Sequence, residues 1–66
     1  MENIHFIITE TYGHYRVFTL HPDFAGKAAW NKFNILAERL GSVIMDITNR
    51  MWEMGYTCDF QVVLNG

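Results

Sequence analysis

Two stretches near the start of the chain have the residue types and spacing of β-strands. Residues 3–9 are rich in β-branched and aromatic side chains with partial alternation, and residues 14–20 repeat that character after a short connection. Gly13 in this connection can adopt the positive φ that a tight turn needs. We therefore predict a β-hairpin. If Thr9 faces His14, the apolar residues of the first strand share one face with Tyr15, Val17 and Thr19. A shifted register would bring Phe18 and Leu20 to that face instead, and both registers stay open.

The strongest pattern is a helical stripe of apolar residues that begins at Trp30. Successive members are three or four positions apart, as on one face of an α-helix. The members are Trp30, Phe33, Ala37, Leu40, Ile44, Ile47, Met51 and Met54. Pro22 and Asp23 are typical of a helix start, so the sequence predicts a helix from about Asp23 to Met54. The unbroken phase favours one helix, with a bend or break at Gly41-Ser42 as the alternative.

A last strand follows the helical segment. Gly55 is a typical helix terminator, and residues 56–64 alternate between apolar and polar side chains. The fold we expect is a single α+β domain over residues 1–66 in the order ββαβ. It has a three-stranded, largely antiparallel sheet with one long amphipathic helix across one face.

Length and composition predict that the chain associates with itself. It has 66 residues, of which 50% are hydrophobic and 18% are charged, and a chain of this size buries only about 60% of its unfolded surface. Cys58 is the only cysteine, so no disulfide within the chain can stabilise the fold. A helix of about 45 Å would also overhang strands of about 24 Å. We therefore expect a homodimer or a higher oligomer.

Charge and compartment signals limit the partners. The formal net charge of −2 gives no source for phosphate attraction, which argues against a nucleic-acid partner. The segment after Met1 has neither a basic region nor an apolar run like that of a secretory signal, and charged residues interrupt every hydrophobic stretch before it is long enough to span a bilayer. We expect a cytoplasmic protein without a membrane segment.

No pattern of reactive side chains predicts catalysis, a metal site or a cofactor. His5, His14 and His21 lack the short spacings of metal motifs. Cys58 lies in the alternating apolar series, which is typical of a buried, inert thiol, and Ser42 is explained by helix capping. We expect a protein that is not an enzyme.

The surplus of aromatic residues and methionine favours a binding function. These residue types are enriched at the centres of protein interfaces. Trp52, Met45 and Ile35 lie off the apolar stripe on one flank of the predicted helix, so we predict that they contact a partner protein or a second subunit. The leading hypothesis is a homo-oligomeric protein-interaction module: an adaptor, regulator or inhibitor, of viral or mobile-element type by its size and lack of motifs.

Two other function classes stay open. One is a small-ligand-binding protein with a pocket at a subunit interface, lined by Tyr12, His14 and Tyr15 together with Trp52. The other is a small enzyme that uses His14 or Cys58, which has the least support.

Overall fold

Residues 1–64 form four strands and one helix. The structure is a computed structural model that describes residues 1–64. In chain order the elements are β1 (Asn3–Thr11), β2 (His14–Thr19), β3 (Lys32–Leu36), α1 (Ala37–Glu53) and β4 (Thr57–Val63). The α+β class is confirmed, but the order is βββαβ and not ββαβ, because β3 precedes the helix.

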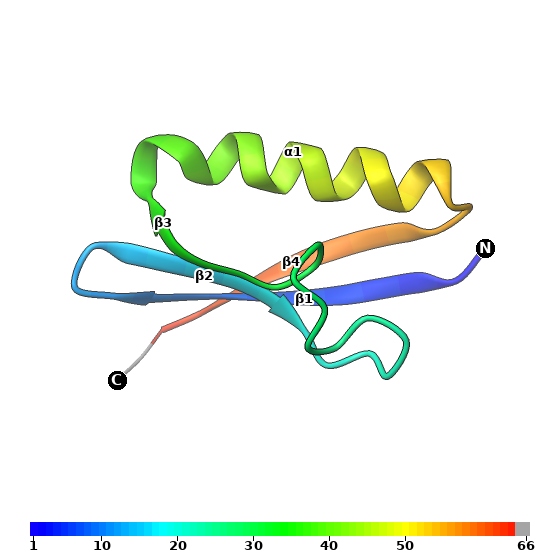
Figure 1. The fold of residues 1–66 in the computed structure, drawn as a ribbon, viewed down its shortest axis with the longest axis horizontal. Coiled ribbons are helices and arrows are strands. Elements are labelled where there is room, and N and C mark those ends of the chain that lie inside the picture. Colours follow the sequence, from blue (N-terminus) through cyan, green and yellow to red (C-terminus); the bar gives the residue numbers. More distant parts are fainter. Residues whose placement is uncertain (65–66) are drawn as a thin grey trace.

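The strands form one mixed sheet in the order β3-β2-β1-β4. β2 pairs antiparallel with β1 and with β3, whereas β4 pairs parallel with β1. α1 therefore connects one edge of the sheet to the other edge, and it lies along one face (Figure 1). Among residues 1–64 no second helix covers the opposite face. The predicted three-stranded sheet is wrong by one strand, and the uncovered face becomes a candidate binding surface.

The helix is much shorter than the sequence pattern predicts. Its predicted start near Asp23 is wrong, because residues 22–30 form turns and α1 begins at Ala37. The 17 residues of α1 span about 26 Å, close to the length of the strands, so the predicted overhang does not occur. The helix continues through Gly41, so a break at Gly41-Ser42 is excluded.

Two residues with positive φ end the apparent helical pattern before Ala37. Gly26 has a φ of 76° and Asn34 has a φ of 54°, and neither fits an α-helix. Trp30 and Phe33 fit the helical spacing by coincidence, since Trp30 is buried in the core whereas Phe33 is largely exposed on the uncovered face of the sheet.

The core lies between the sheet and α1. It gathers alternate residues of the strands and one side of the helix. Its fully buried apolar members are Ile4, Phe6, Val17, Ile47 and Met51. The hairpin pairs Thr9 with Arg16 and not with His14, but the two registers differ by two positions, so each side chain keeps the predicted face.

The segment between β2 and β3 is held to the sheet by a buried asparagine. The Asn31 side chain accepts a hydrogen bond from the Thr19 N–H at 3.2 Å. It donates to the carbonyl oxygens of Phe24 at 3.0 Å and Lys27 at 2.7 Å. The ring of Phe24 also meets the ring of Trp30 edge-on, 5.3 Å between centroids. These contacts fix a loop that has no regular secondary structure.

Over residues 1–64, α1 falls short of the length and apolar content that crossing a bilayer requires.

Candidate functional site

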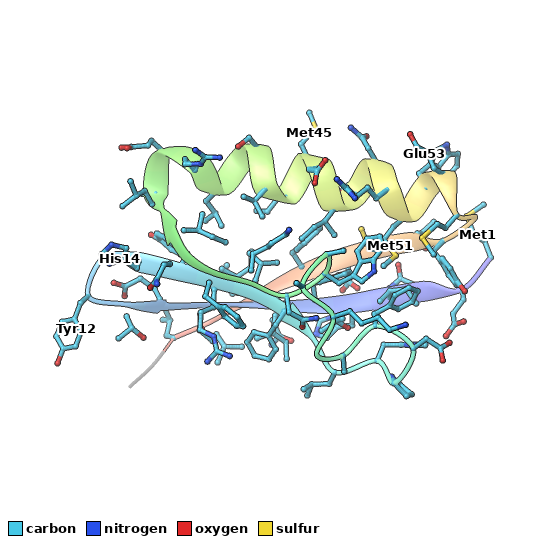
Figure 2. The ribbon with its side chains drawn as sticks, viewed as in Figure 1. Met1, Tyr12, His14, Met45, Met51 and Glu53 are labelled. Atoms are coloured by element: carbon cyan, nitrogen blue, oxygen red, sulfur yellow. The ribbon has the colours of Figure 1, made fainter. Side chains whose placement is uncertain are left out.

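The structure places two of the three predicted interface residues on the surface. Met45 and Trp52 lie on the exposed side of α1, and Figure 2 shows Met45 pointing away from the sheet. Ile35 does not share that flank, because it belongs to β3 and pairs with Tyr15 on the side that faces the core. Its prediction as a residue of the helix flank is wrong, since the segment that carries it is a strand.

The predicted ligand-pocket residues do not come together. Tyr12 lies in the hairpin turn and is 97% exposed (Figure 2). His14 and Tyr15 are neighbours on β2, so their side chains point to opposite faces of the sheet, and Tyr15 packs against the core. Trp52 is next to Glu53, at the other end of the molecule from this turn (Figure 2). No shared pocket results.

The three histidines are also separated. His21 contacts the Glu2 carboxylate at 2.7 Å, His5 contacts Asp59 at 3.1 Å, and His14 is exposed near the hairpin turn. Within the part of the chain that the structure describes, no group of three or more His, Cys, Asp or Glu side chains could hold a metal ion.

A polar network covers the β1–β4 half of the uncovered face. The Asp59 carboxylate accepts a hydrogen bond from the Asn3 amide at 2.8 Å and faces His5 Nδ1 at 3.1 Å. Both contacts lower the pKa of Asp59 below its usual value of 3.8, and the hydrogen bond from Asn3 has the larger effect. His5 Nε2 lies 3.1 Å from Gln61 Oε1, so both ring nitrogens of His5 are engaged. An imidazole held in this way is suited to a structural role.

The β2–β3 half of the same face is aromatic. Arg16 lies between two phenylalanine rings, with its guanidinium carbon 5.0 Å from the centroid of Phe18 and 5.3 Å from that of Phe33. None of the ion pairs between described residues involves Arg16. Phe33 is 61% exposed and Leu20, just after β2, is 71% exposed. We call Arg16, Phe18, Leu20 and Phe33 the aromatic patch.

A hollow of about 360 Å³ opens beside the aromatic patch. The patch forms one wall, and the loop at Ala25, Gly26 and Ala28 forms another. Sequence reasoning missed this site, although one of the two hairpin registers left open places Arg16 and Phe18 on the face away from the core.

A second hollow lies between α1 and β4. It has a volume of about 270 Å³ and is lined by Trp52, Tyr56 and Cys58, together with polar residues of both elements. The Cys58 thiol donates a long hydrogen bond, 3.7 Å between Sγ and Oγ1, to the hydroxyl of Thr48 on α1. Cys58 is thus partly exposed at the rim of a groove and not fully buried as the alternating pattern predicted.

No family model, curated protein or solved structure matches this chain significantly. The functional proposal therefore rests on the chemistry of the surfaces described above.

Proposed function

We propose that this chain is a non-enzymatic protein-interaction module, an adaptor, regulator or inhibitor that acts as a homo-oligomer. It docks its partner protein on the aromatic patch of the uncovered sheet face. The observation that carries the proposal is the placement of Arg16 between Phe18 and Phe33 beside an open hollow.

The residue types of the aromatic patch support a protein partner. Aromatic residues and arginine dominate the energetics of protein interfaces, because they bury a large area and keep directional polar groups. Stacking fixes the plane of the Arg16 guanidinium and leaves its N–H edge available for a carboxylate. The matching partner segment carries an apolar side chain for the hollow and an Asp or Glu side chain for Arg16.

The contacts of His5 and Cys58 support a role without catalysis for these two side chains. Both ring nitrogens of His5 are engaged by Asp59 and Gln61. A general base needs a ring nitrogen that can reach the proton of a substrate. The Cys58 thiol is directed at Thr48, and no histidine is among its described hydrogen-bond partners, so its environment lacks the base that activates a nucleophilic cysteine.

Small-ligand binding is the second candidate function, and one observation favours it. The hollow beside Arg16 has a volume of about 360 Å³ and joins apolar walls to one cation. Ligand sites are often of this size, from about 300 Å³ upward, with few polar groups. A small carboxylate with an apolar body fits this chemistry. Such a site lies away from the predicted residues Tyr12, His14 and Tyr15.

Affinity capture from the source cell tests the proposal, with Arg16→Glu compared with Arg39→Glu. Arg39 is exposed on α1, so its replacement changes the net charge equally without touching the aromatic patch. We expect Arg16→Glu and Phe33→Ala to weaken capture by about 30-fold, the loss of a typical hot-spot side chain, and Arg39→Glu to capture the partner normally.

Two further readouts separate the competing explanations. Met45→Ala tests the exposed flank of α1. If this variant alone failed to capture the partner, the docking site would lie on that flank and not on the aromatic patch. Native mass spectrometry of the purified protein reports a retained small molecule. A bound metabolite that Arg16→Glu loses, together with no captured protein, would replace the interaction-module proposal by the ligand-binding one.

A further inference from the structure

The two edges of the sheet differ in how well they could pair with another strand. β3 has five residues, a register shift against β2 and a left-handed backbone at Asn34. Short and irregular edges of this kind resist pairing. β4 has seven residues in uninterrupted register with β1, and its outer side has no partner among residues 1–64. β4 is therefore the edge that is open to strand addition.

The hydrogen bonds of β4 show which of its backbone groups point outward. The Thr57 N–H donates to the Glu2 carbonyl oxygen at 3.0 Å, so the peptide groups of Thr57 face β1. Along a strand these groups alternate in direction from one residue to the next. The outward N–H and C=O groups consequently belong to Cys58, Phe60 and Val62.

We propose that β4 pairs antiparallel with β4 of a second copy, about a two-fold axis at Phe60. Phe60 is the midpoint of Thr57–Val63, so this register gives the longest overlap of the two strands. It sets Cys58 of each copy opposite Val62 of the other and Phe60 opposite Phe60, so the residues with outward N–H and C=O groups form the hydrogen-bonded pairs of the new ladder. The inference rests on the proposed homo-oligomer and names its interface.

Charge favours this register over its neighbour. With the axis at Phe60, Asp59 of one copy faces Gln61 of the other, a pair that an amide and a carboxylate can satisfy. An axis at Asp59 would also align the outward backbone groups, but it would place two carboxylates directly opposite each other. Like charges in that position are destabilising.

The apolar surface of β4 is complementary to itself in the same register. Val62 and Leu64, at one end, are 62% and 86% exposed. The other end opens into the groove of about 270 Å³ lined by Trp52, Tyr56 and Cys58. Antiparallel pairing brings Val62 beside Cys58 and Leu64 beside Tyr56 of the second copy. The exposed residues of each copy thereby enter the groove of the other and cover Trp52, which is 63% exposed in the single chain.

The resulting dimer keeps both aromatic patches accessible. Pairing through β4 joins the two sheets into one, with both helices on the same side. Arg16 and Phe33 lie on the opposite side, toward the far edge of each sheet. The dimer therefore presents two docking sites on one surface, an arrangement that raises avidity for a partner with two binding segments.

A cysteine at position 62 tests the register directly. In Val62→Cys, the new thiol faces Cys58 of the second copy at a Cα separation of about 5.5 Å, which suits a disulfide. The two cysteines of one chain are four residues apart on a strand, about 13 Å, too far to bond to each other. We expect mild oxidation to convert Val62→Cys to a covalent dimer on a non-reducing gel.

Val63→Cys is the matched control, because its side chain lies on the other face and opposes Thr57. We expect this variant and the wild type to stay monomeric on the gel. Equal crosslinking of Val62→Cys and Val63→Cys, or no crosslinking of Val62→Cys, would overturn the proposed register.

Sedimentation equilibrium separates failure of the edge from failure of the oligomer. We expect a mass near twice the 7.7 kDa chain for the wild type and a single-chain mass for Val62→Lys, which places a charge in the interface. A wild-type dimer that persists in Val62→Lys would mean that the chain associates elsewhere and that only the β4 interface is wrong. A monomeric wild type would show that both the β4 interface and the proposed homo-oligomer are wrong. Partner docking on the aromatic patch would still be tested by affinity capture with Arg16→Glu.

Discussion

Asn31 shows how a single buried amide positions part of the candidate site. Its side chain accepts one backbone hydrogen bond from Thr19 and donates two, to Phe24 and Lys27. A buried polar group is tolerated only when its hydrogen bonds are made. The two bonds that Asn31 donates go to loop backbone, at Phe24 and Lys27, and the one that it accepts ties this loop to Thr19 at the end of β2. Asn31 also lines the hollow beside the aromatic patch, so it couples the order of the loop to the shape of that site.

Replacement of Asn31 by aspartate keeps the shape of the side chain and removes its donors. The carboxylate would face the carbonyl oxygens of Phe24 and Lys27, leaving oxygen opposite oxygen in a buried site. We expect Asn31→Asp to lower the free energy of unfolding by about 1 to 3 kcal/mol. Urea denaturation measures this loss. Asn34→Asp, on the exposed surface of β3 where aspartate also tolerates the positive φ, is the control and should change stability by less than about 0.5 kcal/mol. Equal effects would show that the amide donors of Asn31 are dispensable.

At the scale of elements, the sequence predicted those whose periodicity is long and regular. The hairpin, the last strand and the apolar side of α1 around Ile47 and Met51 follow from such patterns. β3 was missed because it has only five residues, with a positive φ at Asn34 in its middle. A pattern of side chains does not report a left-handed backbone at asparagine, so the spacing of Trp30 and Phe33 extended the helix too far.

The same omission explains why the aromatic patch was not predicted. Only one of the two hairpin registers left open by the sequence puts Arg16 and Phe18 on the face away from the core, and Phe33 reaches them only through β3. Without β3 the sheet has the wrong edge, and the contact between Arg16 and Phe33 cannot be inferred. Met45 and Trp52 were placed on the surface correctly because they lie within the true helix.

Replacement by alanine should change the stability of the fold in opposite directions at Gly41 and Gly55. Gly41 lies inside α1 with open space around it, so Gly41→Ala should stabilise the fold by about 0.5 to 1 kcal/mol. Gly55 has a φ of 87° and follows the end of the helix, where the N–H groups of Gly55 and Tyr56 donate to the carbonyl oxygens of Trp52 and Met51. Gly55→Ala should destabilise by about 1 to 2 kcal/mol, because alanine is strained in that conformation.

Thermal melts of the two glycine variants at one protein concentration measure both effects. A loss of stability in Gly41→Ala would show that the helix is interrupted there, contrary to the structure. An unchanged Gly55→Ala would show that the helix does not depend on its left-handed C-terminal residue.

For the whole molecule, the proposed dimer predicts that stability depends on protein concentration. When folding and association are coupled, mass action raises the melting temperature as the concentration rises. We expect this increase for the wild type in calorimetry over a wide range of concentrations and its absence in Val62→Lys, which is built to stay a single chain. A melting temperature that is independent of concentration in both proteins would contradict coupled folding and association.

The parallel pairing of β1 with β4 has a consequence for the time course of folding. Asn3 and Thr57, which share a hydrogen bond, are 54 residues apart along the chain. The hairpin and α1 can form from neighbouring residues, whereas β1 gains its second partner only after a long loop has closed. During synthesis one side of β1 therefore stays unpaired until β4 has been made. Until then the nascent chain exposes this edge of β1, a central strand of the finished sheet, to other chains. Mutations that delay the arrival of β4 should accordingly promote misassembly through β1 before they lower the stability of the finished fold.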